Sequence, residues 1–445
     1  MAISDLLSIG ASGARAYRAA MGAVSENISN ATTVGYNRRT VSLGESPSSS
    51  ASSAMYKPGV AFGGVEVVAI VRQTDSYLDL AARNAAATFK DADKRATWLD
   101  NVQTALDDGS LGVGQKLTTM FAAAEKLAAN PTDTTLRTNL LFSVEQVNTS
   151  FKQTASDLSN VQNGIVSDAN NEVVAVNDAL SRLASTNEAL GRAIPGSSNA
   201  AQLMDQRDQA LSDISSRLNV TVTFNQGGTA DVTYDGIKLV DNITSKAVAV
   251  TANSDKTLAF SVDGTTIATP TSGSLSGIAS SATVARDRLQ SVNDLATQYV
   301  SDLNTWHSGG TTDAGAAGGD LVTWTPGDIS TLQVAITDTA DIAVNKGGAS
   351  NGNLTAITTI RGTSGVENGW SALIAVHANL LNATNAEQAS ASARNDQAQS
   401  ARADVSGVDL DREAADLMRL QQAYSACARV IQTGKDTLDA ILQIA

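Results

Sequence analysis

The apolar and small residues at both ends of the chain recur at alternating intervals of four and three. Toward the N-terminus they include Leu7, Ala14, Tyr17, Met21, Val24 and Ile28. Toward the C-terminus they include Leu417, Leu420, Tyr424, Ile431, Leu438 and Ile441. An average interval of 3.5 residues is typical of a coiled-coil seam rather than of the broader apolar face of a globular helix. We therefore expect a helix at each end, and the two ends should pack on each other or on copies of themselves.

The two seams could instead be buried within a single chain, as part of the core of a monomer. However, chain termini are normally the frayed parts of a domain. Two helices alone also bury little apolar surface against the entropy of ordering about thirty residues each. We therefore interpret the seams as an assembly surface. We expect both ends to be mobile in the free monomer and to become ordered against neighbouring subunits.

Between the ends, the periodicity changes from helical to extended and back to helical. Helical spacing predicts long helices over the ranges 75–107, 114–130, 132–190 and 202–218, the third with a break near Gly164. Alternation with period two predicts strands over the ranges 220–240, 247–251, 257–262 and 265–268. Helical spacing returns at 282 and again from about 369. The remaining segments suggest a loop over 44–64 and strands over 65–70 and 332–337.

This order of elements predicts a fold that is mainly α with a β insert. We expect an elongated, nested, multidomain subunit, because the two halves of each layer come from opposite ends of the chain. The terminal coiled-coil helices would comprise 1–40 with 403–445, and a helical-bundle middle layer would comprise 41–200 with 282–402. A small antiparallel β-domain, 201–281, would lie at the outer tip, away from the termini.

Composition and charge exclude several classes of function. The 445 residues carry a formal net charge of -14, so no basic stripe is available to bind nucleic acid. No apolar run approaches the eighteen or so residues of a membrane span, which argues against membrane insertion. The N-terminus lacks the basic and apolar regions of a cleaved signal peptide. By itself this favours the cytoplasm, although a protein exported without cleavage would look the same.

Few residues could support catalysis or bind a cofactor. Cys427, the one cysteine, occupies a seam position and is expected to be a small apolar packing residue. His307 precedes a Gly-rich loop, and a hydrogen bond that shapes this loop is a better interpretation than catalysis. Asp205 and Asp208 flank Arg207 on one predicted helix, a pattern that favours an ion-pair network over an acid–base pair. We therefore expect no enzyme, no cofactor and no metal.

Several motifs resemble the flagellar axial proteins. The segment 27–38, Asn-Ile-Ser-Asn-Ala-Thr-Thr-Val-Gly-Tyr-Asn-Arg, resembles their N-terminal signature, with Ser29 and Val34 as departures from the usual residues. Four further segments are similar to the hook-associated protein 1 (FlgK) family. They begin Gly-Val-Glu-Val at 64, Leu-Met-Asp-Gln-Arg-Asp at 203, Leu-Asn-Thr-Trp-His at 303 and Val-Ser-Gly-Val-Asp-Leu-Asp-Arg-Glu at 405.

The resemblance implies a structural subunit at the hook–filament junction, assembled as a helical ring. It implies export through the flagellar type III apparatus and an extracellular location in the flagellum. Its partners would be copies of itself, the hook protein, the second junction protein and an export chaperone at the C-terminal helix. A junction turn would comprise Asn27, Asn30, Gly35 and Tyr36. The chain is short for the family, which implies that one outer domain is reduced or absent.

Two other functions fit the sequence pattern. The chain could be another axial subunit, such as a hook, distal-rod or flagellin-like protein. It could also be a secreted adhesin or effector that uses the β insert as a binding module. The segments at 303–309 and 405–413 favour the junction over the other axial subunits.

Overall fold

The computed structural model describes residues 2–46, 63–106, 109–362 and 364–444. Most of the predicted loop over 44–64 therefore lies outside the described residues. The chain divides into two compact units. Unit 1 contains Met1–Ala87, Ala175–Val248 and Ala393–Ala445, and unit 2 contains Thr88–Val174 and Ala249–Ser392. The fold is mainly α with small antiparallel sheets, as the sequence predicts. The predicted three-layer division remains a prediction.

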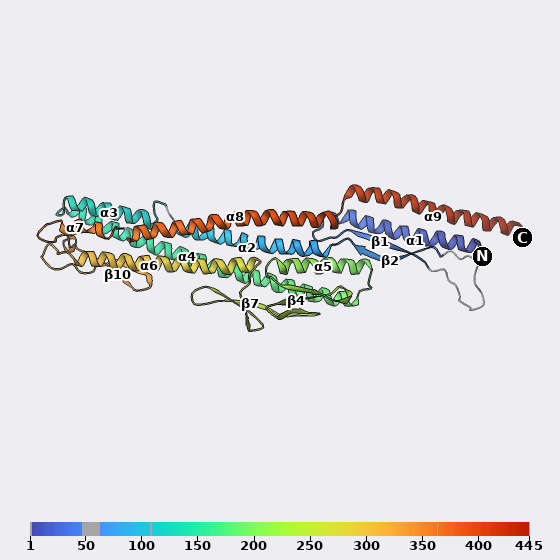
Figure 1. Ribbon diagram of the computed structural model, residues 1–445, viewed down its shortest axis with the longest axis horizontal. Coiled ribbons are helices and arrows are strands. Elements are labelled where there is room, and N and C mark those ends of the chain that lie inside the picture. The colour runs from blue at the N-terminus through green and yellow to red at the C-terminus, as the bar shows by residue number, and fades with distance from the viewer. Residues whose placement is uncertain (1, 47–62, 107–108, 363, 445) are drawn as a thin grey trace. The chain divides into compact units, whose positions relative to one another are not determined.

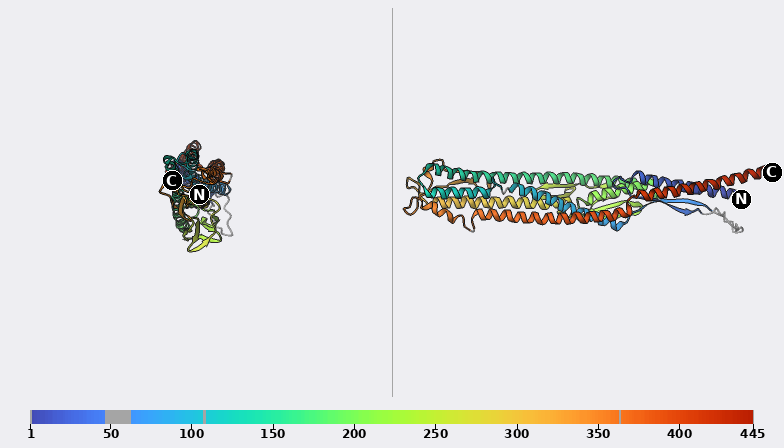
Figure 2. Two further views of the ribbon diagram at one scale, coloured as in Figure 1. Left: turned by 90° about the vertical axis from the view of Figure 1, so that its left-hand side faces the viewer. Right: turned by 90° about the horizontal axis from the view of Figure 1, so that it is seen from above.

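Unit 1 contains both ends of the chain. Helices α1 and α9 lie side by side, and the two termini lie close together (Figures 1 and 2). The elements that lie wholly in this unit are α1 (Ala2–Ser29), β1 (Arg39–Glu45), β2 (Val65–Arg72), α5 (Ser198–Ser215), β3 (Thr221–Phe224), β4 (Ala230–Tyr234), β5 (Ile237–Asp241), β6 (Thr244–Ser245) and α9 (Leu410–Ile444). Three helices contribute residues to both units, namely α2 (Ser76–Leu106), α4 (Thr134–Arg192) and α8 (Val366–Ser406).

Unit 2 is a bundle whose helices run alongside one another (Figure 1). Its own elements are α3 (Val113–Ala129), β8 (Leu258–Val262), β9 (Thr265–Ile267), α6 (Ser274–Ser308), β10 (Val322–Thr325), β11 (Asp328–Val334) and α7 (Gly352–Ala356), and it holds most of β7 (Val248–Ala252). Three fully buried aromatic rings lie in its core. The Phe151 ring centroid is 5.5 Å from that of Tyr299 and 6.1 Å from that of Trp370.

The β region forms two sheets rather than one. One sheet has the order β3-β4-β5-β6 and the other has the order β7-β8-β9. The Asp235-Gly236 hairpin is present between β4 and β5, and both residues have the positive φ that such a turn requires (48° and 76°). The separate strands β1 and β2 pair antiparallel with a register shift between Ser42 and Leu43. The sequence pattern predicted β2 but missed β1.

Three predicted boundaries are wrong. Helix α4 continues for 59 residues without a break at Gly164, where an added Cβ would lie 2.9 Å from the Trp98 ring. That glycine makes room for an aromatic neighbour and does not end a helix. Helix α6 begins at Ser274, eight residues before the predicted start, directly after Gly273 with a φ of 83°. The strand predicted over 332–337 is β11, which ends at Val334 and pairs with β10.

Candidate functional site

The terminal helix pair, α1 and α9, packs through glycines. A Cβ added to Gly10 would lie 2.8 Å from Ile431, and one added to Gly13 would lie 2.7 Å from the Sγ of Cys427. At the other end of the contact, a Cβ on Gly434 would lie 3.0 Å from Leu7. Small residues let two helix backbones approach closely. The expected packing of the two chain ends on each other is therefore present.

The predicted seam residues of α1 differ in exposure. Val24 is buried, whereas Ile28 is 36% exposed. The other predicted positions are half-buried: Leu7, Ala14, Tyr17 and Met21. Gly10, Gly13, Ala16, Ala23 and Asn27 are fully buried. Apart from Gly10, these buried residues lie outside the predicted heptad series. Apart from Val24 and Asn27, the buried residues of this helix are glycines and alanines.

The predicted seam of α9 is only partly covered. Leu417, Leu420, Ile431 and Cys427 are half-buried. Tyr424, Leu438 and Ile441 are 39%, 40% and 49% exposed. A helix whose apolar seam is left half in solvent is typical of an element that completes its packing against another chain.

The terminal helix pair ends in a buried cluster of polar side chains, which we call the polar joint. It comprises Asn27, Tyr36, Arg38, Arg39, Arg72, Asp205, Asp208 and Glu413, all in unit 1. These residues come from the end of α1, the turn after it, β1, β2, α5 and the start of α9. Four chain segments far apart in sequence thus meet in one cluster.

Asn27 uses its whole side-chain amide in this cluster. Its Nδ2 donates to the carbonyl of Arg39 and to Oε2 of Glu413, both over 2.9 Å. Its Oδ1 accepts the backbone N–H of Arg39 at 2.9 Å and the hydroxyl of Tyr36 at 2.8 Å. Asn27 is fully buried, so each of these bonds replaces one to water. The residue holds the turn against both terminal helices.

The turn itself requires Gly35, which has a φ of 80°. It brings Tyr36 under the guanidinium of Arg39, which lies 4.8 Å from the ring centroid. Burial raises the pKa of Tyr36 to about 12, although the Arg39 charge opposes this. The fourth predicted turn residue, Asn30, has a local role instead. Its Nδ2 donates to the carbonyl of Glu26.

Ion pairs complete the polar joint. Arg38 pairs with Glu413 at 2.6 Å, and Glu413 is fully buried. The Asp205 carboxylate forms ion pairs with Nη2 of Arg39 at 2.9 Å and with Nε of Arg72 at 2.8 Å. A buried charge is costly unless it is paired and hydrogen-bonded. Glu413 accepts from Asn27 and Arg38, and Asp205 accepts from Arg39, Arg72 and the side-chain amide of Asn37.

Asp205 and Asp208 therefore form the ion-pair network that the sequence suggested. Arg207 donates to Asp208 over 2.6 Å and stacks on Phe224, with its guanidinium 4.7 Å from the ring centroid. Arg72 also reaches Asp208. Because both carboxylates already accept bonds from arginines, neither is arranged as a general acid or base.

Sequence reasoning missed the arginines and Glu413 as members of one site. Each of them lies inside or directly beside one of the motifs described above: Arg38 and Arg39 after Gly35-Tyr36, Arg72 at the end of β2, and Glu413 at the end of the segment 405–413. The signal was a charged residue at the edge of each motif, but nothing in the sequence indicated that the motifs meet.

A second polar arrangement lies in unit 2, around His307. Its Nε2 accepts the N–H of Ala343 at 2.9 Å, so the proton resides on Nδ1, which donates to the carbonyl of Gly319 at 2.6 Å. Burial lowers the pKa of His307 below its ordinary value near 6.5. Asn304, one turn earlier, binds Leu321 and Val322 through its amide. The expected loop-shaping role of His307 is confirmed.

The described residues offer little else for chemistry. None of their His, Cys, Asp and Glu side chains gather in groups of three or more that could hold a metal ion. Within the same residues, no helix is both long and apolar enough to cross a bilayer.

Comparison with known proteins identifies two matching regions. Residues 99–322 match the family model described as the flagellar hook-associated protein FlgK helical domain. Residues 399–444, which contain Glu413 and all of α9, match the C-terminal model of flagellar basal body rod FlgEFG proteins.

Individual relatives agree with these matches. The chain is 25% identical to flagellar hook-associated protein 1 of Bacillus subtilis over 96% of this chain and 95% of that protein. It is 26% identical to the Escherichia coli protein of the same name, over 72% of this chain but only 60% of that protein. The solved flagellar hook junction protein FlgK from Burkholderia pseudomallei shares the fold over 55% of this chain and 46% of its own, with a TM-score of 0.50 and 22% identity.

Proposed function

Because this chain belongs to the FlgK family of flagellar hook-associated proteins, we propose that it is a structural subunit of the bacterial flagellum that joins the hook to the filament. The observation that carries the proposal is the polar joint. Four motif segments meet there, and the joint fixes a terminal helix pair whose seam is left partly exposed. A helix pair that is anchored at its base and has uncovered apolar positions suits a subunit that completes its packing in an assembly.

The copies would form a helical ring in which the terminal helix pairs pack on one another. The exposed seam residues Tyr424, Leu438 and Ile441 support this part of the proposal. The ring would transmit torque from the hook to the filament, and the polar joint would carry load between the terminal helices and the rest of unit 1. Buried arginine–carboxylate pairs suit that task because their geometry is directional.

Family members associate with other axial components of the flagellum. More specifically, we propose the hook protein on one face of the ring and the second junction protein on the other. The protein would reach the outside of the flagellum through the type III apparatus, without a cleaved signal peptide. An export chaperone would cover the apolar residues of the C-terminal helix, where Leu442 is 67% exposed.

A deletion strain tests the proposal. Its flagella would be imaged, and flagellin in the culture medium would be measured. We expect hooks without filaments and unassembled flagellin in the medium, with both defects corrected by the wild-type chain. Normal filaments in the deletion strain would overturn the proposed function and would direct attention to the β sheets as a ligand-binding module.

A further inference from the structure

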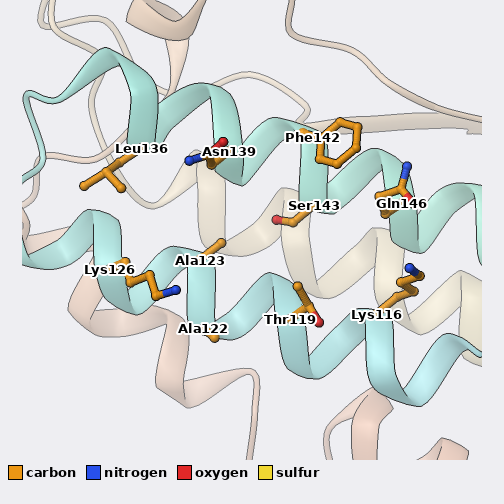
Figure 3. A pocket seen from close by; sticks show the side chains of 10 residues that line it. All are labelled: Lys116, Thr119, Ala122, Ala123, Lys126, Leu136, Asn139, Phe142, Ser143 and Gln146. Atoms are coloured by element: carbon orange, nitrogen blue, oxygen red, sulfur yellow. The ribbon is translucent and has the colours of Figure 1, made fainter. Parts of the chain in front are cut away.

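A groove of about 360 Å3 lies between α3 and the first turns of α4, within unit 2. Figure 3 shows Leu136 and Phe142 along α4 on one side, and Ala122 and Ala123 on α3 opposite them. Between Lys116 and Lys126, the α3 wall is made of the short side chains of Thr119, Ala122 and Ala123. A helix from another molecule could therefore lie close to the α3 backbone.

Phe142 is the apolar anchor of this groove. Its ring is 63% exposed, although it stands on a helix of 59 residues and faces a recess. Exposed aromatic side chains on rigid elements are the type of residue that dominates binding energy in protein interfaces. The half-buried Leu136 also lines the groove, from the first turn of α4.

The charges that border the groove are all positive. Lys116 and Lys126 line it from α3, and no carboxylate lines it. They are ten positions apart (116 to 126), which corresponds to about 15 Å along the helix. Neither lysine forms an ion pair with any residue that the structure describes. The whole chain carries 45 acidic against 31 basic residues, so this basic recess contrasts with an acidic molecule.

This charge pattern selects the geometry of contact with another copy. Two copies that met groove to groove would place lysine against lysine and would repel each other. A head-to-tail contact instead places the groove against a different surface of the neighbour, which the net charge of -14 favours as an acidic one. Head-to-tail contacts are the kind that build rings and helical assemblies.

We propose that the α3–α4 groove receives an acidic, amphipathic helix face of a second copy of this chain, with Phe142 as the anchor and the two lysines as charge partners. The inference rests on the proposed function, because the second copy is the neighbouring subunit of the ring. It adds to that function a lateral contact in unit 2, separate from the terminal helix pair.

Photo-crosslinking in assembled flagella tests the contact. Phe142 is replaced with p-benzoylphenylalanine in a deletion strain that carries the full-length chain, and flagella are irradiated and analysed by peptide mass spectrometry. We expect crosslinks from position 142 to an acidic helical segment of a second copy. Crosslinks only within one chain, only to a different flagellar protein, or to nothing at all would overturn the inference.

Charge reversal provides the control. The pair K116E with K126E should reduce the crosslink at least tenfold. The pair K90E with K256E changes the net charge of unit 2 by the same amount at exposed sites outside the groove and should leave the crosslink unchanged. An equal effect of both pairs would contradict a specific contact. Flagella built from the position-142 variant that complement the deletion but show no crosslink to a second copy would overturn the groove alone, whereas normal filaments in the deletion strain without any copy of the chain would overturn both proposals.

Discussion

The side-chain amide of Asn27 donates a hydrogen bond to the carboxylate of Glu413 over 2.9 Å, although the two residues are 386 positions apart in sequence. Both side chains are fully buried. The bond joins the end of the first helix to the start of the last one, at the base of the terminal helix pair.

Replacing Asn27 by aspartate should loosen this link. The variant keeps the shape of the side chain but removes the donor to Glu413, and it places a second carboxylate beside the first. We expect the free energy of unfolding to fall by about 3 kcal/mol, because buried like charges and unpaired polar groups are costly. In the wild type, the backbone N–H of Arg39 donates to Oδ1 of Asn27. Faster hydrogen exchange of this N–H in the variant would report the loosening.

Asn30→Asp is the matched control for that variant. Asn30 is half-buried and its amide donates only to the carbonyl of Glu26, so the change should cost well under half as much. Equal effects of the two substitutions on exchange at Arg39 would argue against a special role for the buried amide.

Gly13→Ala should separate the terminal helix pair. The added Cβ would lie 2.7 Å from the Sγ of Cys427, and overpacking of this kind costs about 1–3 kcal/mol. Gly22→Ala is the control on the same helix, because no atom lies within 4 Å of its added Cβ and alanine favours helix by about 1 kcal/mol. Complementation of the deletion strain should fall for the first variant and not for the second.

Unit 2 should lose stability as the pH falls below about 6.5. Burial lowers the pKa of His307, and burial together with the Arg288 charge lowers that of His377. The unfolded chain then binds protons more tightly than the folded one. The stabilisation is therefore fully present above pH 6.5 and is lost as the pH falls through the folded pKa values.

Thermal unfolding between pH 8 and pH 5 measures this effect. His307→Gln should be less stable than the wild type at pH 8, since it loses the hydrogen bonds with the N–H of Ala343 and the carbonyl of Gly319. Its stability should, however, depend less on pH. A variant with the same pH slope as the wild type would show that the proton on His307 is not linked to folding.

Tyr36→Phe should remove one hydrogen bond to Asn27 at a cost of about 1 kcal/mol. Because burial raises the folded pKa of Tyr36 to about 12, the phenol stabilises the fold below pH 10, and this contribution is lost as the pH rises through 12. The difference in tyrosinate absorbance between wild type and variant should therefore appear near pH 12. A difference centred near pH 10 would contradict the buried position.

The helices were largely predictable from local pattern. The predicted ranges 75–107 and 114–130 agree with α2 and α3 to within one residue at each end, because these helices bury one apolar stripe and are bounded by polar or glycine residues. The failures have local causes. Gly164 was interpreted as a break, but it accommodates the Trp98 ring inside a continuous helix. Strand β1 alternates only over the short run Val41-Ser42-Leu43-Gly44, and its first residue is a charged side chain, Arg39, which is buried by its ion pairs.

The polar joint was not predictable in the same way. Its members were visible as motifs, but their meeting depends on contacts between residues 38 and 413 or 72 and 205, which no local periodicity encodes. The seam heptads indicated that the ends pair, and Gly10 and Gly434 belong to them. Gly13, whose added Cβ would lie 2.7 Å from the Sγ of Cys427, lies outside the heptad series. Heptad spacing identifies a face of a helix, whereas the depth of each residue depends on how closely the partner approaches.

The central claim is that the exposed seam of the terminal helix pair is an assembly surface. Hydrogen exchange of the segments 2–29 and 410–444, compared between the free monomer and isolated hook–filament junctions, tests it most directly. We expect rapid exchange around Tyr424, Leu438 and Ile441 in the monomer and strong protection in the junction. Equal protection in the two states would contradict the claim, because the seam would then be complete within a single chain.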